Sequence, residues 1–348
     1  MKKKWHLFLR LGVVLLLMGF ARLSQAKHLE MEVLPNDQLV IYGFEGRVRL
    51  ISQQNKKVKN LEVHFKQENP SKAPFELETA FFNRWGFSLQ RKGNVLEASI
   101  DSPHSKRIWS KLLGSGRIPQ FYMEITSPPI PVEVVWRKGK VNIENWNAPL
   151  KTHVLQGEIR IVGGKGRVQV TLQEGDFTLS AREGPVEVES FKGNASIDQV
   201  KGRIDLENFS GSTRINRVEG PMNLVSTSGT LKVDDCNGRL KFNNLRANVS
   251  VSGFSGELRG RSEAGAVSAI VKGKADVRIY SKEGNVSLRL PNSGAEVNLG
   301  TREGEMILPR HLRVSRFPNL RWTKGLLRGN IKGGNVYVRT TEGHILLR

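Results

Sequence analysis

The most regular feature of the chain is a small residue at every ninth position. Counting in nines from residue 139 to residue 265 gives fifteen positions, of which thirteen are Gly and two, Ala148 and Ala247, are Ala. The side chain two places after this anchor is apolar in fourteen of the fifteen units, and the one four places after it is apolar in thirteen. The side chain between them is polar or charged in every unit, as in Glu187 and Lys232. Such alternation is typical of a short strand with one buried and one exposed face.

Each nine-residue unit is therefore predicted to be one strand followed by a tight turn. Gly suits the turn because it has no Cβ and tolerates a positive φ or a close backbone contact. A further, mostly apolar row lies seven places after the anchor, and we expect it to point inward at the corners. Its members between residues 191 and 254 are Phe191, Val200, Phe209, Val218, Thr227, Cys236, Leu245 and Phe254.

The repeat predicts an all-β fold, a parallel β-solenoid (β-helix) with a nine-residue strand-turn repeat. One unit cannot bury its own apolar face, so the units are expected to stack on one another. Two units would make an 18-residue coil and three a 27-residue coil, and the sequence leaves this choice open. An antiparallel meander is the alternative fold. Hairpins favour Asn-Gly or Asp-Gly turns, and Asn237-Gly238 is the one such pair in the repeat region.

The regular repeats have flanks of a different character. Residues 27–130 alternate like strands but lack the nine-residue register, so we expect an irregular, strand-rich N-terminal cap. The solenoid repeats are assigned to residues 131–308, although their register loosens after Gly265. A basic loop is expected at 309–333, and residues 334–348 are expected to supply the final solenoid strands.

The first 26 residues have the order of features found in a secretory signal peptide. Three lysines at positions 2–4 precede an uncharged apolar run at 11–20, and Ser24 and Ala26 supply small residues for a cut after Ala26. The apolar run is shorter than the roughly 20 residues that a membrane-spanning helix needs. An uncleaved anchor is the alternative. No later stretch is apolar enough to span a bilayer, so we expect export to the periplasm or surface of a bacterium.

The chain is strongly basic. Its formal charge is +21, and five of these charges lie in the first 26 residues, which leaves +16 for the remainder. A balance of this kind favours acidic partners such as anionic polysaccharides, lipid head groups or nucleic acid. Export makes nucleic acid the least suitable of the three. The alternative interpretation is that the charges only solvate the surface. With one cysteine, Cys236, an exported chain forms no internal disulfide.

The segment 309–333 is the most charge-biased part of the chain after the signal. It contains seven basic residues and no acid. Arg presents forked donors that match sulfate, phosphate or carboxylate, so the segment is a candidate anion-binding loop. A solvated loop over the end of the solenoid is the alternative. The candidate residues are Arg310, Arg313, Arg316, Arg321, Lys324, Arg328 and Lys332.

Motifs for catalysis or metal binding do not stand out in the sequence. The seven histidines are scattered without an HExxH or paired spacing, and no CxxC pair, phosphate-binding loop or GxSxG motif occurs. We therefore expect no metal and no cofactor. Asp234-Asp235 is the one adjacent acid pair in the repeats, and paired carboxylates can serve a polysaccharide hydrolase. Cys236 falls in the inward row, so a buried hydrophobe is expected rather than a reactive thiol.

Several segments repeat a Ser-Gly-x-apolar-x-apolar phrase or a close variant. They are STSGTLKV at 226–233, SKEGNVSLRLP at 281–291 and TTEGHI at 340–345. In this respect residues 130–348, and more faintly 38–65, resemble the bacterial "putative adhesin" domain family, a group of unknown function. The resemblance implies an exported β-solenoid and brings no ligand or catalytic residue with it. The basic charge, the nine-residue regularity and the segment 309–333 depart from the family pattern.

These features together predict a non-enzymatic binding or scaffold protein of the bacterial envelope or surface, adhesin-like in character. Its expected partners are anionic envelope polymers or surface ligands. Two alternatives remain open. One is a β-helical enzyme that acts on an acidic polysaccharide, and the other is an assembly factor that hands on lipid or glycan.

Overall fold

The computed structural model describes residues 27–53, 59–67, 86–101, 121–291 and 293–348. The predicted signal peptide, residues 1–26, lies outside them. The described residues form 25 strands in one sheet and no helix, so the all-β prediction is confirmed. No helix among them is long and apolar enough to cross a membrane. The strands are β1 (Lys27–Glu32), β2 (Gln38–Ser52), β3 (Asn60–Gln67), β4 (Gly86–Lys92), β5 (Val95–Asp101), β6 (Phe121–Ser127), β7 (Val132–Glu144), β8 (Leu150–Val162), β9 (Val168–Glu183), β10 (Val186–Lys192), β11 (Ala195–Lys201), β12 (Ile204–Ser210), β13 (Thr213–Glu219), β14 (Met222–Ser228), β15 (Thr230–Asp234), β16 (Asn237–Asn244), β17 (Asn248–Ser262), β18 (Val267–Ser281), β19 (Val286–Arg289), β20 (Ser293–Thr301), β21 (Met306–Ile307), β22 (Ser315–Phe317), β23 (Leu320–Leu327), β24 (Ile331–Thr340) and β25 (Ile345–Leu347).

Strands of the repeat region pair in parallel with the strand that lies 18 residues further along the chain. Val168 of β9 lies beside Val186 of β10, which lies beside Ile204 of β12. Successive nine-residue units therefore alternate between two faces, and 18 residues, here called a coil, bring the chain back to the same face. The parallel pairing excludes the antiparallel meander, and the offset decides between the 18- and 27-residue coils. Face 1 carries β10, β12, β14 and β16, and face 2 carries β11, β13 and β15.

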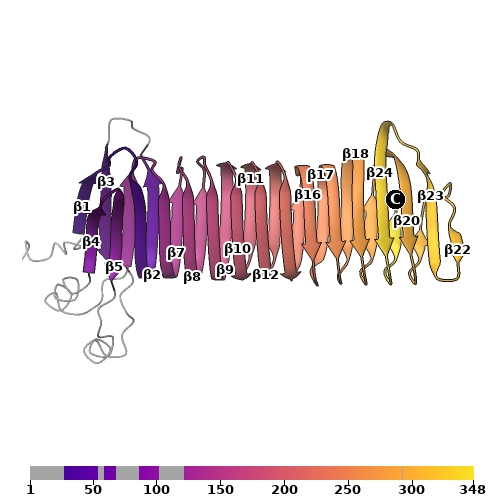
Figure 1. Cartoon of the computed structure of the whole chain (residues 1–348), viewed down its shortest axis with the longest axis horizontal. Helices are drawn as coiled ribbons and strands as arrows, with labels where there is room; N and C mark the ends of the chain where they lie inside the picture. Colours follow the sequence, from indigo (N-terminus) through magenta and orange to yellow (C-terminus); the bar gives the residue numbers. More distant parts are fainter. Residues whose placement is uncertain (1–26, 54–58, 68–85, 102–120, 292) are drawn as a thin grey trace, which may run out of the picture.

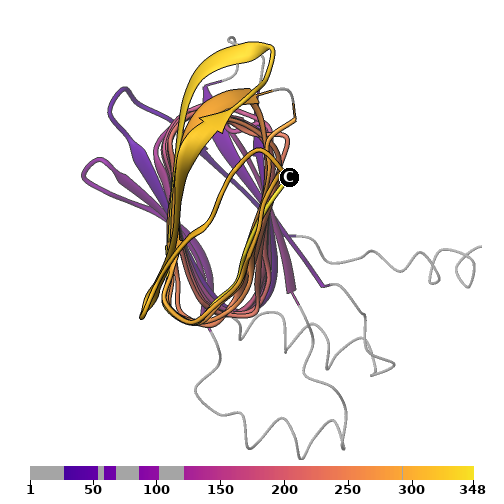
Figure 2. The same ribbon diagram turned by 90° about the vertical axis from the view of Figure 1, so that its right-hand side faces the viewer.

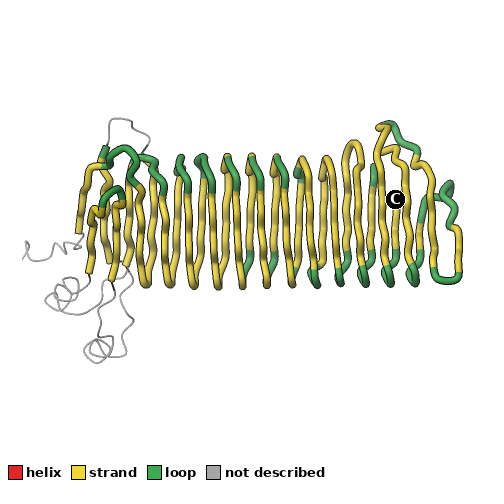
Figure 3. The backbone as a smooth tube through the Cα atoms, viewed as in Figure 1, coloured by secondary structure: helices red, strands yellow, loops and turns green. Residues whose placement is uncertain are grey.

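The sheet closes around a single apolar core that runs the length of the molecule. Coils follow one another along the long axis (Figure 1), and end-on they overlie as a flattened closed loop (Figure 2). Loops gather at the two long edges, where the chain passes from one face to the other (Figure 3). The apolar residues two and four places after each anchor, such as Val186 and Val188, are buried as the alternation predicts.

The anchor glycines meet both conditions that favour Gly over every other residue. Gly175 has a φ of 131°, which L side chains rarely adopt, and it stacks directly on the backbone of Gly157. A Cβ on Gly175 would lie 1.7 Å from the carbonyl oxygen of Gly157. The corner backbone therefore stacks at a distance that leaves no space for a side chain.

The two edges of the molecule turn in different ways, which corrects the predicted inward row. Val200, Val218, Cys236 and Phe254 are buried, whereas Leu245 is 44% exposed. Three other members, Phe191, Phe209 and Thr227, are half-buried. Residues before the buried members adopt a left-handed conformation that turns the next side chain inward; they are Gln199, Arg217, Asp235 and Gly253.

At the other edge a small polar residue one place earlier takes the inward position. Asn208 and Asn244 are buried there, as are three serines. The Nδ2 of Asn244 donates to the carbonyl oxygen of Ala247 at 2.5 Å and to Oγ of Ser262 at 3.0 Å, while its Oδ1 accepts from the backbone N–H of Ala247 at 2.7 Å. Such side chains satisfy the corner groups that strand pairing leaves unpaired. The serines are Ser190, Ser226 and Ser262.

Arg182 occupies the buried edge where the chain makes the Gly-rich turn at 163–166. Its guanidinium donates to carbonyl oxygens of Lys165 at 2.7 Å and of Ala148 and Gly163 at 3.1 Å. Burial lowers the pKa of Arg182 to about 10, so the group stays charged at neutral pH. The carbonyl oxygens replace the water that a buried cation loses.

The N-terminal strands belong to the same sheet but pair less regularly. Three antiparallel pairs occur there, β1 with β3, β3 with β6 and β4 with β5. The long strand β2 pairs in parallel with β5, β6 and β7, and thereby joins these strands to the repeats.

The C-terminal coil does not stack last. β24 lies between β18 and β20 on face 1, and β25 lies between β19 and β21 on face 2. Residues 331–348 are thus inserted between two coils that precede them in the sequence. β23 pairs antiparallel with β20, and β22 with β23, so these strands form the far end of the molecule (Figure 1). The expected loop at 309–333 is therefore corrected, because two strands lie within it.

A single methyl group at an anchor is expected to destabilise the stack. Gly175→Ala should lower the free energy of unfolding by about 3 kcal/mol, because the positive φ and the backbone contact both oppose a Cβ. Gly93→Ala is the matched control. Gly93 also has a positive φ, but a Cβ added there would have no atom within 4 Å, so a loss of about 1 kcal/mol is expected. Urea unfolding followed by circular dichroism measures both; equal losses would contradict the stacking argument.

Candidate functional site

Outward side chains form rows across the coils because each one lies beside the residue a coil away. On face 1 two such rows change in character along the molecule, from acidic near β10 to basic near β18. The first row is Glu187, Asp205, Asn223, Lys241, Arg259, Arg278 and Tyr337. The second row is Glu189, Glu207, Val225, Asn243, Arg261, Tyr280 and Arg339.

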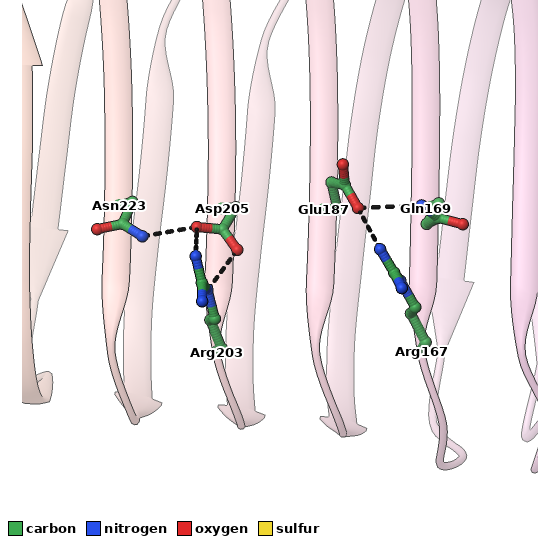
Figure 4. Close-up of polar contacts among 6 residues, drawn as sticks. All are labelled: Arg167, Gln169, Glu187, Arg203, Asp205 and Asn223. Atoms are coloured by element: carbon green, nitrogen blue, oxygen red, sulfur yellow. Dashed lines mark hydrogen bonds and ion pairs between the residues drawn. The ribbon is translucent and has the colours of Figure 1, made fainter.

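In the acidic half the carboxylates accept hydrogen bonds across neighbouring coils (Figure 4). Arg167 and Gln169 donate to Glu187 at 2.8 and 3.0 Å. These bonds hold the pKa of Glu187 below its usual value, with Arg167 as the larger cause. A general acid needs a raised pKa to carry a proton at neutral pH. The arrangement therefore suits a charged ladder that ties coils together.

Asp205 shows the same outcome with an opposing contribution. Burial raises the pKa of Asp205, but hydrogen bonds from Arg203 at 2.6 Å and from Asn223 at 2.7 Å outweigh it and leave the pKa lowered. The acid pair at 234–235 is also neutralised by cations. Asp234 lies 3.2 Å from Lys232 and Asp235 lies 3.5 Å from Lys272.

The basic half contains a groove of about 650 Å³ between the edge of face 1 and the end strands. Four cations line it together with the half-exposed ring of Tyr280. Among the described lining residues, Glu263 is the one acid, and it lies 3.2 Å from Arg261. The groove therefore carries an excess of positive charge. The four cations are Arg261, Lys282, Arg302 and Arg339.

Arg339 is held in place by its neighbours. Its Nη2 donates to Oδ1 of Asn298 at 2.9 Å, and its guanidinium carbon lies 4.6 Å from the ring centre of Tyr337. Gly300 leaves room for the guanidinium, since a Cβ there would lie 2.6 Å from Nη1 of Arg339. Within the described part of the chain this Nη1 has no hydrogen-bond partner. A positioned Arg with an unused donor suits the recognition of an anionic oxygen.

The seven basic residues predicted from the sequence lie beside this groove and do not line it. Arg310, Arg313, Arg316 and Arg328 are exposed around the end strands. Lys324 lies 3.6 Å from Glu296, and Arg321 donates to the carbonyl oxygen of Gly304 at 2.5 Å. The side chain of Lys332 lies outside the described ones. Leu320 is the residue of this segment that lines the groove.

Sequence reasoning missed the four groove cations. Part of the signal was present, since sorting the residues three places after the anchor by 18 gives Glu187, Asp205, Asn223, Lys241 and Arg259. That series already shows the change from acid to base along face 1. The positions of Arg302 and Arg339 depend on the inserted C-terminal coil, which no periodicity indicates.

No family model and no curated protein matches the chain. Solved structures that it is similar to include a "putative cell adhesion protein" from Clostridium sporogenes, at 11% identity and a TM-score of 0.23, covering 93% of this chain and 99% of that one. A "putative adhesin" from Bacteroides fragilis matches at 13% identity and a TM-score of 0.25, covering 93% and 98%. A "putative lipid binding protein" from Parabacteroides distasonis matches at 15% identity and a TM-score of 0.26, covering 77% and 94%.

Structures described as adhesins are thus among those similar to this chain, as the sequence resemblance predicted. At these identities and TM-scores the likeness assigns neither a ligand nor an activity. The argument for function therefore has to come from the groove and the surfaces around it.

Cys236 is expected to be unreactive in the folded protein. Its side chain is 2% exposed, and burial raises the pKa of its thiol to about 11. Because the thiolate is the reactive form, a maleimide at mildly alkaline pH should modify Cys236 only after unfolding in urea. Mass spectrometry of the native and unfolded chain gives the comparison, and rapid modification of the native chain would contradict a buried structural role.

Proposed function

We propose that this chain is an exported, non-enzymatic binding protein of a bacterial envelope, built as a parallel β-solenoid, whose groove binds anionic polymers. The 18-residue pairing offset supports the solenoid, and the signal pattern in residues 1–26 supports export to the periplasm or cell surface. Attachment to acidic glycans would agree with the adhesin resemblance.

The observation that carries this proposal is the combination of cations and an aromatic ring in one groove. Arginine forks pair with carboxylate, sulfate or phosphate oxygens. Tyr280 is 51% exposed, and its ring lies 5.5 Å from that of Tyr337. Rings that are apolar on the face and polar at the tip suit ligands with both characters, as an acidic sugar chain has. We therefore favour an acidic polysaccharide as the polymer.

Binding without catalysis is favoured by the small number of carboxylates in the groove. Hydrolysis of a glycosidic bond uses two carboxyl groups on opposite sides of the bond. Among the described lining residues Glu263 alone is acidic, and Arg261 lies against it. The enzyme alternative predicts that an acidic polysaccharide becomes shorter during incubation with the protein.

The assembly-factor alternative is kept because a second, apolar groove exists. It has a volume of about 500 Å³ and lies over β2, β7 and β8. Tyr42, Val135 and Leu155 line it, and Arg137 lies 4.2 Å from the ring centre of Phe44 at its side. An acyl chain is the ligand that this lining suits, and displacement of a fluorescent fatty acid tests it.

Neutralising the groove should weaken binding of a polyuronate such as alginate. We expect Arg261→Gln, Lys282→Gln and Arg302→Gln together to reduce affinity by roughly tenfold or more at low salt, and added salt to weaken the native protein, because exposed charges are screened. The matched control changes Lys138, Arg160 and Arg214 to Gln. These three are exposed cations outside the groove. Equal losses in both triple variants would show a net-charge effect and overturn the groove assignment.

The opposite change tests the same site in the other direction. Glu263→Gln removes the acid that lies against Arg261, so affinity for the polyuronate should rise by roughly two- to fivefold. Microcalorimetry measures the affinity, and size-exclusion chromatography of the polymer after incubation tests for cleavage. Weaker binding by Glu263→Gln, or a shortened polymer, would speak for the enzyme alternative.

A further inference from the structure

The far end of the molecule exposes large apolar side chains together with cations. This end, here called the C-terminal cap, consists of β21, the crossing segment 308–314, β22 and β23. Ile307, Phe317, Leu320 and Leu326 are 60%, 56%, 39% and 70% exposed. Large exposed apolar residues gathered in one region mark a surface that meets a partner.

The strand pairing explains why these side chains face outward. β23 alternates, so Leu320 and Leu326 lie on the outer side while Thr323 between them is buried. In the β22–β23 pair Phe317 lies directly opposite Leu320, which places both side chains on the same side of the sheet. Leu312 from the crossing segment covers the core instead. The cap thus closes the core with one set of apolar residues and exposes another.

The charges of the cap have one sign. Residues 309–333 contain no Asp or Glu. Arg310, Arg313, Arg316 and Arg328 are exposed, and no ion pair involves them within the part of the chain that the structure describes. Apolar and cationic side chains are therefore interleaved on one surface, the pattern of protein segments that lie in the head-group region of anionic membranes.

We propose that the C-terminal cap docks on an anionic lipid bilayer, with Phe317 and Leu326 entering the interface and the arginines contacting lipid phosphates. A dissolved polysaccharide would leave the apolar side chains in water. A second copy of the cap would bring unneutralised arginines together. An anionic bilayer takes up both kinds of side chain. This surface is separate from the polymer groove except for Leu320, which borders both, so the two proposals stand or fall independently.

A position-specific probe tests the docking in the full chain. Leu326→Cys, labelled with a polarity-sensitive maleimide dye, should show a blue shift with vesicles of phosphatidylglycerol and phosphatidylethanolamine, and none with phosphatidylcholine. Ser250→Cys, an exposed position on face 2, is the matched control and should not respond. The native Cys236 is buried and stays unlabelled. Because both variants carry residues 1–26, vesicle binding through that segment alone would leave both dyes unchanged and overturn the proposal.

Substitutions identify the forces involved. Phe317→Ser with Leu326→Ser should weaken vesicle binding by roughly tenfold or more, and each Gln replacing Arg310, Arg313 or Arg316 by roughly fivefold. The groove variant at Arg261, Lys282 and Arg302 should retain most vesicle binding while losing polyuronate. Vesicle binding unaffected by the cap substitutions would overturn the proposal, as would a dye response at position 326 that follows protein concentration without vesicles, which would indicate a second copy.

Discussion

Parallel pairing of each strand with the strand one coil away is the constraint on which the rest of this structure depends. It places Val168, Val186 and Ile204 in one buried row and stacks the anchor glycines backbone on backbone. The same pairing sets outward residues side by side across the coils. A surface on face 1 is therefore composed of residues 18 apart, and its chemistry changes gradually along the axis, from the ladder at Glu187 to the cations near Arg261.

Much of the fold could be predicted because its causes are local. Alternation within a unit determines which side chains are buried, and the anchor position reveals the corner that only Gly tolerates. The number of units in a coil is not local, since it depends on which edge the chain turns at. Phe191 and Val200 occupy equivalent places in the nine-residue pattern, yet Val200 is buried because Gln199 adopts a positive φ and Phe191 is only half-buried. Nothing in a nine-residue count separates the two edges.

The candidate site was harder to predict for a related reason. Residues 309–333 stand out in the sequence because their charges are contiguous, and the structure places them around the end of the molecule. The groove instead collects Arg261, Lys282, Arg302 and Arg339 from four separate strands or turns. Three-dimensional adjacency of this kind follows from strand order, and the strand order here departs from the chain order. The anion-binding role of the contiguous segment stays a prediction, with a lipid surface as its proposed partner.

The inserted C-terminal coil has a consequence for the route by which the chain reaches its native state. Residues 276–281 and 295–301 do not pair with each other; β24, made after both, separates them. Growth of the stack in the order of synthesis would therefore stop short of the native arrangement. The last event must be a wedging of the chain's own end between two earlier coils, so a chain that lacks its final 18 residues would have an open seam rather than a shorter stack.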